Sequence, residues 1–168
     1  MNEKHQWYLV FTKVKSELKA KEHLTRQGYI TYLPMAQKRV RRNCKYVYIT
    51  EPFFPRYLFI KLNTETDNWG PIRSTVGVSC IVRFGGVSAV VPEDLIVELQ
   101  QQENEIGLHK GDEKQLRSGD KIMVLDGPFA GYQGIFQSTK SAERIAILLD
   151  IVGRNIAVTL SMHDLRIA

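Results

Sequence analysis

The residues that could do chemistry are mostly cations, and they are concentrated near the N-terminus. Residues 1–61 hold 13 Lys and Arg against 4 Asp and Glu, whereas residues 101–168 hold 8 against 9. Among them, Lys13, Lys15, Lys19 and His23 lie close together, where ammonium groups could hold phosphates and an imidazole could stack on a base. Taken singly, each Lys is more often a solvated surface charge. The grouping favours a nucleic-acid or acidic protein partner.

A second basic run spans residues 38–45 (KRVRRNCK) and includes Arg41 and Arg42. It is expected at the tip of a hairpin between strands, where it could follow DNA through electrostatic attraction. A charge run of this kind is also compatible with a solvated loop that binds nothing.

Motifs for catalysis or metal binding are absent from the sequence. The four His are scattered, and Cys44 and Cys80 form no Cys-x-x-Cys pair, so neither a zinc site nor a disulfide framework has its ligands. The usual nucleophile, phosphate-loop and metalloprotease motifs are missing too. We therefore expect no enzyme, no metal and no cofactor.

The composition is that of a folded protein, with 43% hydrophobic residues. The first ten residues include charged and polar side chains, and no apolar run is long enough to cross a bilayer. We expect a cytoplasmic monomer without a membrane segment.

Hydrophobic periodicity predicts a mixed α/β domain in the first hundred residues. Residues 7–12 (WYLVFT) are typical of a buried strand. A helix is expected from an N-cap at Ser16 to a stop at Gly28, with Leu18 and Leu24 at helical spacing. Further strands are predicted over residues 30–33, 45–50, 57–62 and 78–84, followed by a helix that starts near Pro92.

A polar stretch separates this half from the last fifty residues, so the predicted boundaries are 1–102, a linker at 103–117, and 118–168. Beyond the linker, short apolar runs separated by Gly, Ser and Asp suggest a small β-barrel. Its strands are expected over residues 121–125, 134–137, 144–149 and 155–159. Residues 142–152 (AERIAILLDIV) would also suit a helix, and both readings are open.

Several segments resemble a known family. Residues 119–135 (GDKIMVLDGPFAGYQGI) resemble the KOW motif, in which an alternating strand reaches a Gly-Pro turn. Earlier, WYLVFTK, EHL, EPFFPRYLFI and TVGVSCIVRFGG resemble, in that order, the N-terminal domain of the NusG family of transcription factors. His23, residues 51–60 and residues 82–86 are more similar to its specialised RfaH-type members. The resemblance implies an α/β domain, with an antiparallel sheet flanked by helices, and a KOW β-barrel that in RfaH-type members can switch to an α-helical hairpin.

The resemblance also implies a surface that binds RNA polymerase. The residues at the family's clamp-helix contact are Phe11, Tyr57, Phe59, Ile81 and Ile96, and those at its gate-loop contact are Asn68 and Trp69. Aromatic anchors suit such a contact. On sequence alone the same side chains would be read as core, and Trp69 could pack its own loop down instead.

The expected nucleic-acid surface faces the non-template DNA strand. It consists of Lys13, Lys15, Ser16, Lys19 and His23 near the first helix, Arg41 and Arg42 in the basic run, and Thr75, which is carried over from the family motif. RfaH-type members usually have Arg after this Thr, whereas this chain has Val76, so the resemblance implies that one base or phosphate contact is missing there.

Two further residues match an interdomain ion pair of RfaH-type members, Glu51 and Arg144. If the pair is buried between the domains, deleting one partner would strand the other charge. That change would weaken the interface by about 3–5 kcal/mol.

A NusG-type factor would act by binding, holding the polymerase clamp closed around DNA and so disfavouring pausing. The KOW domain would bind a small-subunit ribosomal protein, more readily than a termination factor. The nearest alternative is a general NusG-like factor without DNA specificity or autoinhibition. A KOW-bearing RNA-binding module of the translation machinery is another, and the N-terminal motifs argue against it.

Overall fold

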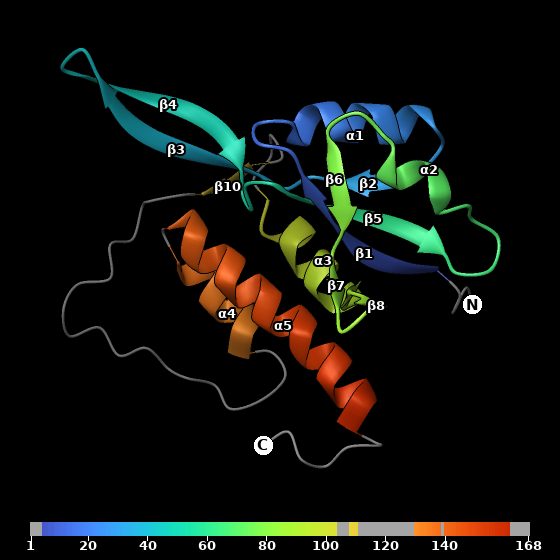
Figure 1. Cartoon of the computed structure of the whole chain (residues 1–168). Helices are drawn as coiled ribbons and strands as arrows, with labels where there is room; N and C mark the ends of the chain where they lie inside the picture. Colours follow the sequence, from blue (N-terminus) through green and yellow to red (C-terminus); the bar gives the residue numbers. More distant parts are fainter. Residues whose placement is uncertain (1–4, 104–107, 111–129, 139, 162–168) are drawn as a thin grey trace.

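The computed structural model describes residues 5–103, 108–110, 130–138 and 140–161 (Figure 1). Helices cover both faces of an antiparallel sheet, and a two-stranded ribbon extends to one side. The elements in chain order are β1 (His5–Thr12), α1 (Glu17–Arg26), β2 (Ile30–Tyr32), β3 (Met35–Arg42), β4 (Lys45–Pro52), β5 (Tyr57–Asn63), α2 (Gly70–Arg73), β6 (Val78–Ile81), β7 (Arg83–Phe84), β8 (Val87–Ser88), β9 (Val90–Val91), α3 (Glu93–Gln101), β10 (Leu108–Lys110), α4 (Ala130–Gln137) and α5 (Ser141–Ser161).

The main sheet has the order β2-β5-β1-β6, with β9 also paired to β1, and all these pairs are antiparallel. Because side chains alternate along a strand, β1 contributes to two separate cores. Tyr8 and Val10 pack on the side covered by α1, which we call the α1 face, and Trp7 and Leu9 pack on the opposite side, the α5 face. The predicted α/β domain with an antiparallel sheet is confirmed.

Helix α1 covers the α1 face through Ala20 and Leu24, which are fully buried. Leu18, by contrast, is 62% exposed. The expectation that Leu18 and Leu24 share one apolar stripe is wrong, because six positions along a helix place two side chains on different sides of it. Ser16 stands at the N-cap position without a capping hydrogen bond from its side chain. Gly28, with φ +93°, follows the helix as predicted.

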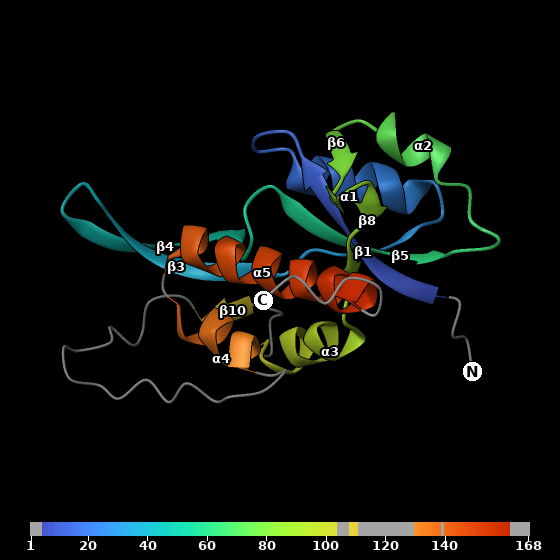
Figure 2. The same ribbon diagram turned by 60° about the horizontal axis from the view of Figure 1, so that its bottom comes forward.

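The α5 face is covered by α3 together with the two C-terminal helices (Figure 2). Leu95 and Leu99 of α3 are fully buried there, and so are Ile135 of α4 and Leu148 of α5. The C-terminal helices therefore share one hydrophobic core with the sheet.

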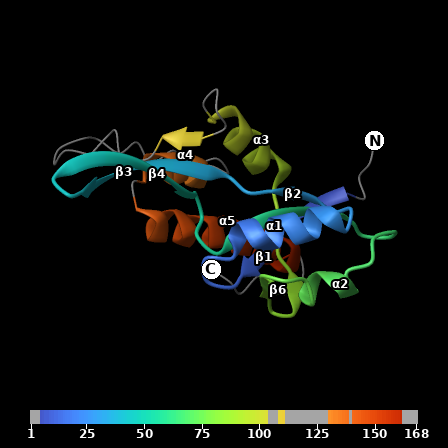
Figure 3. The ribbon, with the colours of Figure 1, turned by 90° about the horizontal axis from the view of Figure 1, so that it is seen from above.

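Strands β3 and β4 form an antiparallel ribbon that extends beyond the main sheet (Figure 3). The strand β4 and a basic hairpin tip were predicted from the sequence, but the strand over Met35–Arg42 was not. At the tip, Asn43 and Cys44 have φ of 50° and 62°, the left-handed conformation that a two-residue hairpin turn requires. Strand β10 pairs in parallel with the start of β3, so part of the expected linker is attached to the base of the ribbon.

In the C-terminal region the structure has helices where strands were predicted. Residues 134–137 lie in α4, and residues 144–149 and 155–159 lie in α5. The strand predictions over these three segments are wrong for this structure. The helical reading of residues 142–152 is confirmed, and its physical basis is the apolar stripe that α5 packs against the sheet domain.

Other predictions fall on residues that lie outside the described part of the chain. They are the KOW-like turn at Gly127 and Pro128 and the strand at 121–125. Most of the expected linker at 103–117 also lies outside it. The proposed division into domains is therefore carried forward as a prediction.

Candidate functional site: a covered sheet face and two basic surfaces

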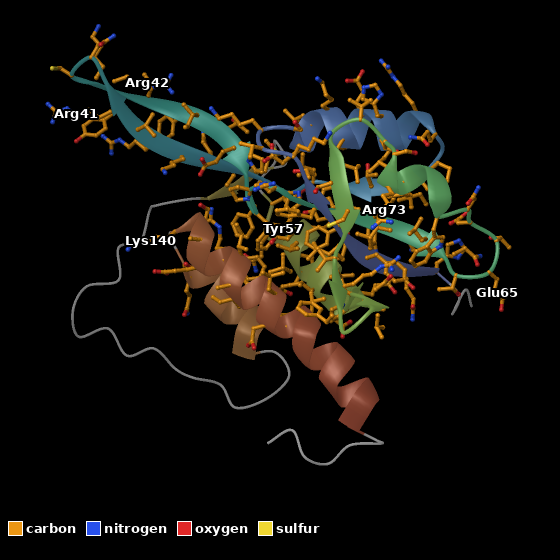
Figure 4. All side chains as sticks on the ribbon, viewed as in Figure 1. Arg41, Arg42, Tyr57, Glu65, Arg73 and Lys140 are labelled. Carbon is orange, nitrogen blue, oxygen red and sulfur yellow. The ribbon has the colours of Figure 1, made fainter. Side chains whose placement is uncertain are left out.

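Four of the five residues predicted to bind polymerase clamp helices share the α5 face. Phe11 and Tyr57 are opposite each other on β1 and β5, with ring centroids 5.2 Å apart. Phe59 follows two residues later on the same side of β5 and is fully buried, as is Ile96 of α3. Figure 4 places Tyr57 between the sheet and α5.

Ile81 is the exception. It pairs with Val10 and packs with the cluster beneath α1, so grouping it with the α5 face is wrong. The neighbouring Cys80 pairs with Phe11 and takes the corresponding place on the α5 face. The register of β6 against β1 decides between these two neighbours, and a one-residue change of register exchanges the faces.

The C-terminal helices cover the α5 face with apolar side chains. Ile135 of α4 and Leu148 of α5 belong to the same buried cluster as Phe59 and Ile96. The Phe136 ring of α4 lies against Phe53 with the centroids 6.4 Å apart. Part of the surface predicted to contact polymerase is therefore covered by the chain's own C-terminal helices.

Arg144 anchors α5 to the sheet domain. Its side chain is 2% exposed, and Nε donates to the backbone carbonyl of Phe53 at 3.0 Å while Nη1 donates to that of Ser138 at 3.2 Å. The guanidinium carbon lies 4.4 Å from the centroid of the Phe53 ring. A buried cation is tolerated because such donors are satisfied. Phe53 lies two residues beyond Glu51, and the ion pair between Glu51 and Arg144 stays a prediction.

Burial also changes the acidity of tyrosines at this interface. It raises the pKa of Tyr132 on α4, and the negative charge of Asp94 on α3 raises it further. Burial likewise raises the pKa of Tyr57, while the nearby Arg56 acts to lower it and Cys80 to raise it. Both hydroxyls are thus held in their neutral form, which suits an apolar interface.

The residues predicted to bind nucleic acid near the first helix run from the turn before α1 to its last turn, which holds His23. We call the N-terminal part of this surface, from Lys13 to Lys19, the basic end of α1. Lys13 and Lys15 are exposed in the turn that leads into α1, and Ser16, Lys19 and His23 follow at helical spacing. Gly77 holds this end in place: its carbonyl accepts a hydrogen bond from the N–H of Lys13 at 2.9 Å. A Cβ at Gly77 would lie 3.0 Å from the Ser16 carbonyl oxygen, and its φ is +87°, so a side chain would be strained there.

Thr75 is buried, and its hydroxyl is used within the protein. The hydroxyl donates to the Pro71 carbonyl at 2.8 Å and accepts a hydrogen bond from Nε2 of Gln27 at 2.8 Å. The same Gln27 nitrogen lies 3.1 Å from the carbonyl oxygen of His23 and donates to it. Thr75 therefore connects α2 to the end of α1 that carries His23, while the neighbouring Val76 is 52% exposed.

The predicted gate-loop residues divide into one packed and one exposed side chain. The Trp69 ring packs edge-on against Tyr8, with centroids 4.6 Å apart, and belongs to the margin of the α1-face core. Asn68 is exposed, and its backbone carbonyl accepts a hydrogen bond from the Tyr29 hydroxyl at 2.6 Å. The packing alternative raised for Trp69 thus matches the structure.

Arg41 and Arg42 lie at the far end of the ribbon (Figure 4). Both are exposed, and they pair across the strands with Tyr46 and Lys45. The basic run is thus part of an ordered ribbon, with the two-residue turn at its tip, rather than an irregular loop.

Three interface residues were missed by the sequence analysis, namely Cys80, Phe53 and Phe84. Phe84 of β7 packs at the margin of the α5-face core, and a Cβ at Gly153 of α5 would lie 3.9 Å from its ring. Phe53 and Phe84 belong to the segments EPFF and VRFGG, which had been noted only as family motifs. Their density of aromatic residues was the available signal.

The α5 face offers apolar contact area, and the basic end of α1 and the β3–β4 ribbon offer positive charge. Within the described residues, no three His, Cys, Asp or Glu side chains are grouped so that they could hold a metal ion. Nor does any helix in the described part of the chain have the length and apolarity to span a membrane.

Comparison with known proteins identifies the family. The family model described as transcription termination factor NusG matches residues 5–103, more than half of the chain. The transcription termination/antitermination proteins NusG of Staphylococcus aureus and Staphylococcus carnosus are 25% and 23% identical over 175 residues, covering 95% of this chain and 94% of theirs. A solved structure of Thermotoga maritima NusG, which concerns its domain interaction, is 22% identical with a TM-score of 0.43, over 60% of this chain and 58% of that one. The chain therefore belongs to the NusG family of transcription termination and antitermination factors.

Proposed function

We propose that this chain is a regulated, RfaH-type NusG factor in which α4 and α5 mask the surface that binds RNA polymerase. The supporting observation is that Phe59 and Ile96 are buried in the same hydrophobic cluster as Ile135 of α4 and Leu148 of α5. Apolar anchors of this kind bind a partner helix when they are exposed. Polymerase binding at this face therefore requires the two helices to leave.

Release is an equilibrium between a masked and an open state, and a partner that binds only the open state shifts it. Once released, residues 118–168 refold into the KOW barrel predicted from their short apolar runs, since two packings of one sequence need differ by only a few kcal/mol. The barrel then binds a small-subunit ribosomal protein, which couples transcription to translation.

The basic end of α1 binds the exposed non-template DNA strand of the transcribing complex. Lys13, Lys15 and Lys19 supply the charge for phosphate contacts, and His23 lies beside them. This surface lies on the α1 side of the sheet, away from the helices that cover the α5 face. DNA can therefore be contacted before the mask is released, and clamp binding afterwards suppresses pausing.

The masking proposal is tested by placing a charge beneath the cover. In Leu148→Asp a carboxylate replaces a fully buried side chain, which disfavours docking by several kcal/mol, on the order of the cost of an unpaired buried charge. Ala146→Asp adds the same charge at an exposed position of α5 and is the matched control. We expect the affinity of core RNA polymerase for Leu148→Asp to exceed that for the unaltered chain and for Ala146→Asp by at least about tenfold.

Two other results would change the conclusion. Equal, tight binding by all three proteins would indicate constitutive polymerase binding, as expected for a general NusG-like factor. Absence of binding even by Leu148→Asp, with its sheet domain still folded by circular dichroism, would contradict the polymerase proposal itself.

A further inference from the structure

The register of the β3–β4 ribbon gives its two faces different chemistry. Arg39 pairs with Tyr48, and Arg41 pairs with Tyr46. Residues directly opposite each other in an antiparallel pair project to the same side, so these four side chains form one surface, which we call the Arg–Tyr face. The opposite face carries Lys38, Val40, Arg42, Lys45, Val47 and Ile49.

The two aromatic rings of the Arg–Tyr face are presented to solvent. Tyr46 is 61% exposed and Tyr48 is 62% exposed, and neither belongs to the buried clusters of the described residues. The guanidinium carbon of Arg39 lies 4.0 Å from the centroid of the Tyr46 ring, a cation–π contact that fixes the cation beside an aromatic surface. The face therefore combines two exposed rings with one cation, Arg39, that is held beside a ring.

The charge of the ribbon specifies the kind of partner. Residues 36–50 contain five Lys and Arg and no Asp or Glu. Such a field attracts a polyanion. Exposed rings next to guanidinium groups suit unpaired nucleotides, because bases that are not stacked in a duplex can stack on aromatic side chains.

We propose that the Arg–Tyr face binds an unpaired tract of nucleic acid, with Tyr46 and Tyr48 stacking on bases and Arg39 and Arg41 contacting phosphates. This deepens the proposed function and rests on it for the setting, a transcribing complex that exposes single strands. The binding itself requires no polymerase.

The test is fluorescence anisotropy with the full-length protein and a labelled oligothymidine of about 12 nucleotides, within the range of known single-strand sites. Tyr46→Leu/Tyr48→Leu removes both rings and keeps apolar side chains on the strand. We expect this double variant to bind the single strand at least about thirtyfold more weakly, because each base that stacks on an aromatic ring contributes about 1–3 kcal/mol. Its affinity for a duplex of the same length should be unchanged.

Charge is tested separately by two matched double variants. Arg39→Gln/Arg41→Gln and Lys38→Gln/Arg42→Gln each remove two charges from the same ribbon, but from opposite faces. The first should weaken single-strand binding more than the second. The basic end of α1 is identical in every variant, so the differences report on the ribbon alone.

The proposal is overturned if the two charge variants lose equal affinity and the Leu variant loses none, because attraction would then be electrostatic and independent of face. It is also overturned if the unaltered chain binds the duplex as tightly as the single strand, or binds neither. These assays contain no polymerase, so their failure is separate from failure of the Leu148→Asp experiment.

Discussion

At the residue scale, we expect the docking of α5 on the sheet domain to depend on Arg144. Replacing it by Met keeps an apolar stem but removes the hydrogen bonds to the carbonyls of Phe53 and Ser138. We expect Arg144→Met to weaken docking of α5 by about 1–3 kcal/mol, the range for lost hydrogen bonds from a buried polar group. Hydrogen–deuterium exchange over residues 144–152 should become faster.

Lys140→Met, at an exposed position just before α5, is the control and should leave the exchange unchanged. If Arg144→Met exchanges as slowly as the unaltered protein, apolar packing alone holds the helix, and Arg144 has no anchoring role.

Val76 provides a second prediction at this scale, because it is exposed beside the basic end of α1. Val76→Arg adds a cation where RfaH-type members have one, so we expect tighter binding of single-stranded DNA. One added phosphate contact should steepen the dependence of log K on log salt concentration by about 0.7. Val97→Arg adds the same charge at an exposed position of α3. Equal gains from both variants would show that only net charge matters.

Thr75 and Ile81 show that residue types alone do not predict hydrogen-bond partners or the direction of a side chain. Ile81 was correctly expected in a strand and Thr75 was carried over from a family motif, but the hydroxyl of Thr75 is occupied by Pro71 and Gln27, and Ile81 faces the other core. A motif specifies which residue is present. The hydrogen-bond partners of that residue, and the face of the sheet to which its side chain points, depend on strand register and on distant segments. A motif carries no information about either.

At the element scale, much of the N-terminal half could be predicted because its signals are local, but β3 was missed and the strand expected over residues 78–84 is divided into β6 and β7. The aromatic run of β1, the helix formers between Ser16 and Gly28, and the acids at the start of α3 each indicate their own structure. The C-terminal half could not be predicted in the same way. Residues 142–152 suit a strand or a helix, and contacts with distant residues such as Phe53 stabilise the helix.

The docking of α4 should also depend on pH. In the docked state the pKa of Tyr132 is raised above its ordinary value of 10.0 by burial and by Asp94. Below that pH the hydroxyl is neutral in both states and docking is at full strength. As pH rises above about 10, the released state loses its proton first and is favoured, so docking weakens.

Tyr132→Phe should reduce this dependence, and Tyr46→Phe, which changes an exposed tyrosine, should not. The methyl NMR signals of Leu148 would report the docked fraction across the pH range. If Tyr132→Phe loses docking at high pH as strongly as the unaltered protein does, titrating groups other than Tyr132 cause the effect.

At the scale of the whole molecule, the surfaces are divided by the sheet. The α5 face is closed by the C-terminal helices, whereas the basic end of α1 and the ribbon lie outside that interface. Under the proposed function, the masked protein can contact nucleic acid while its polymerase-binding face is covered. The proposal thus implies that clamp binding is confined to complexes that have already presented a DNA strand.

Helices α4 and α5 and the α5 face that they cover belong to one polypeptide. Between them in the chain, β10 pairs with β3. Closure is consequently a unimolecular event, and its equilibrium is independent of how much of the protein a cell makes. Diluting the factor does not open it, and overproducing it does not close it. Under the proposed function, its activity depends on the partners that compete with the helices, so each molecule responds to its own transcription complex.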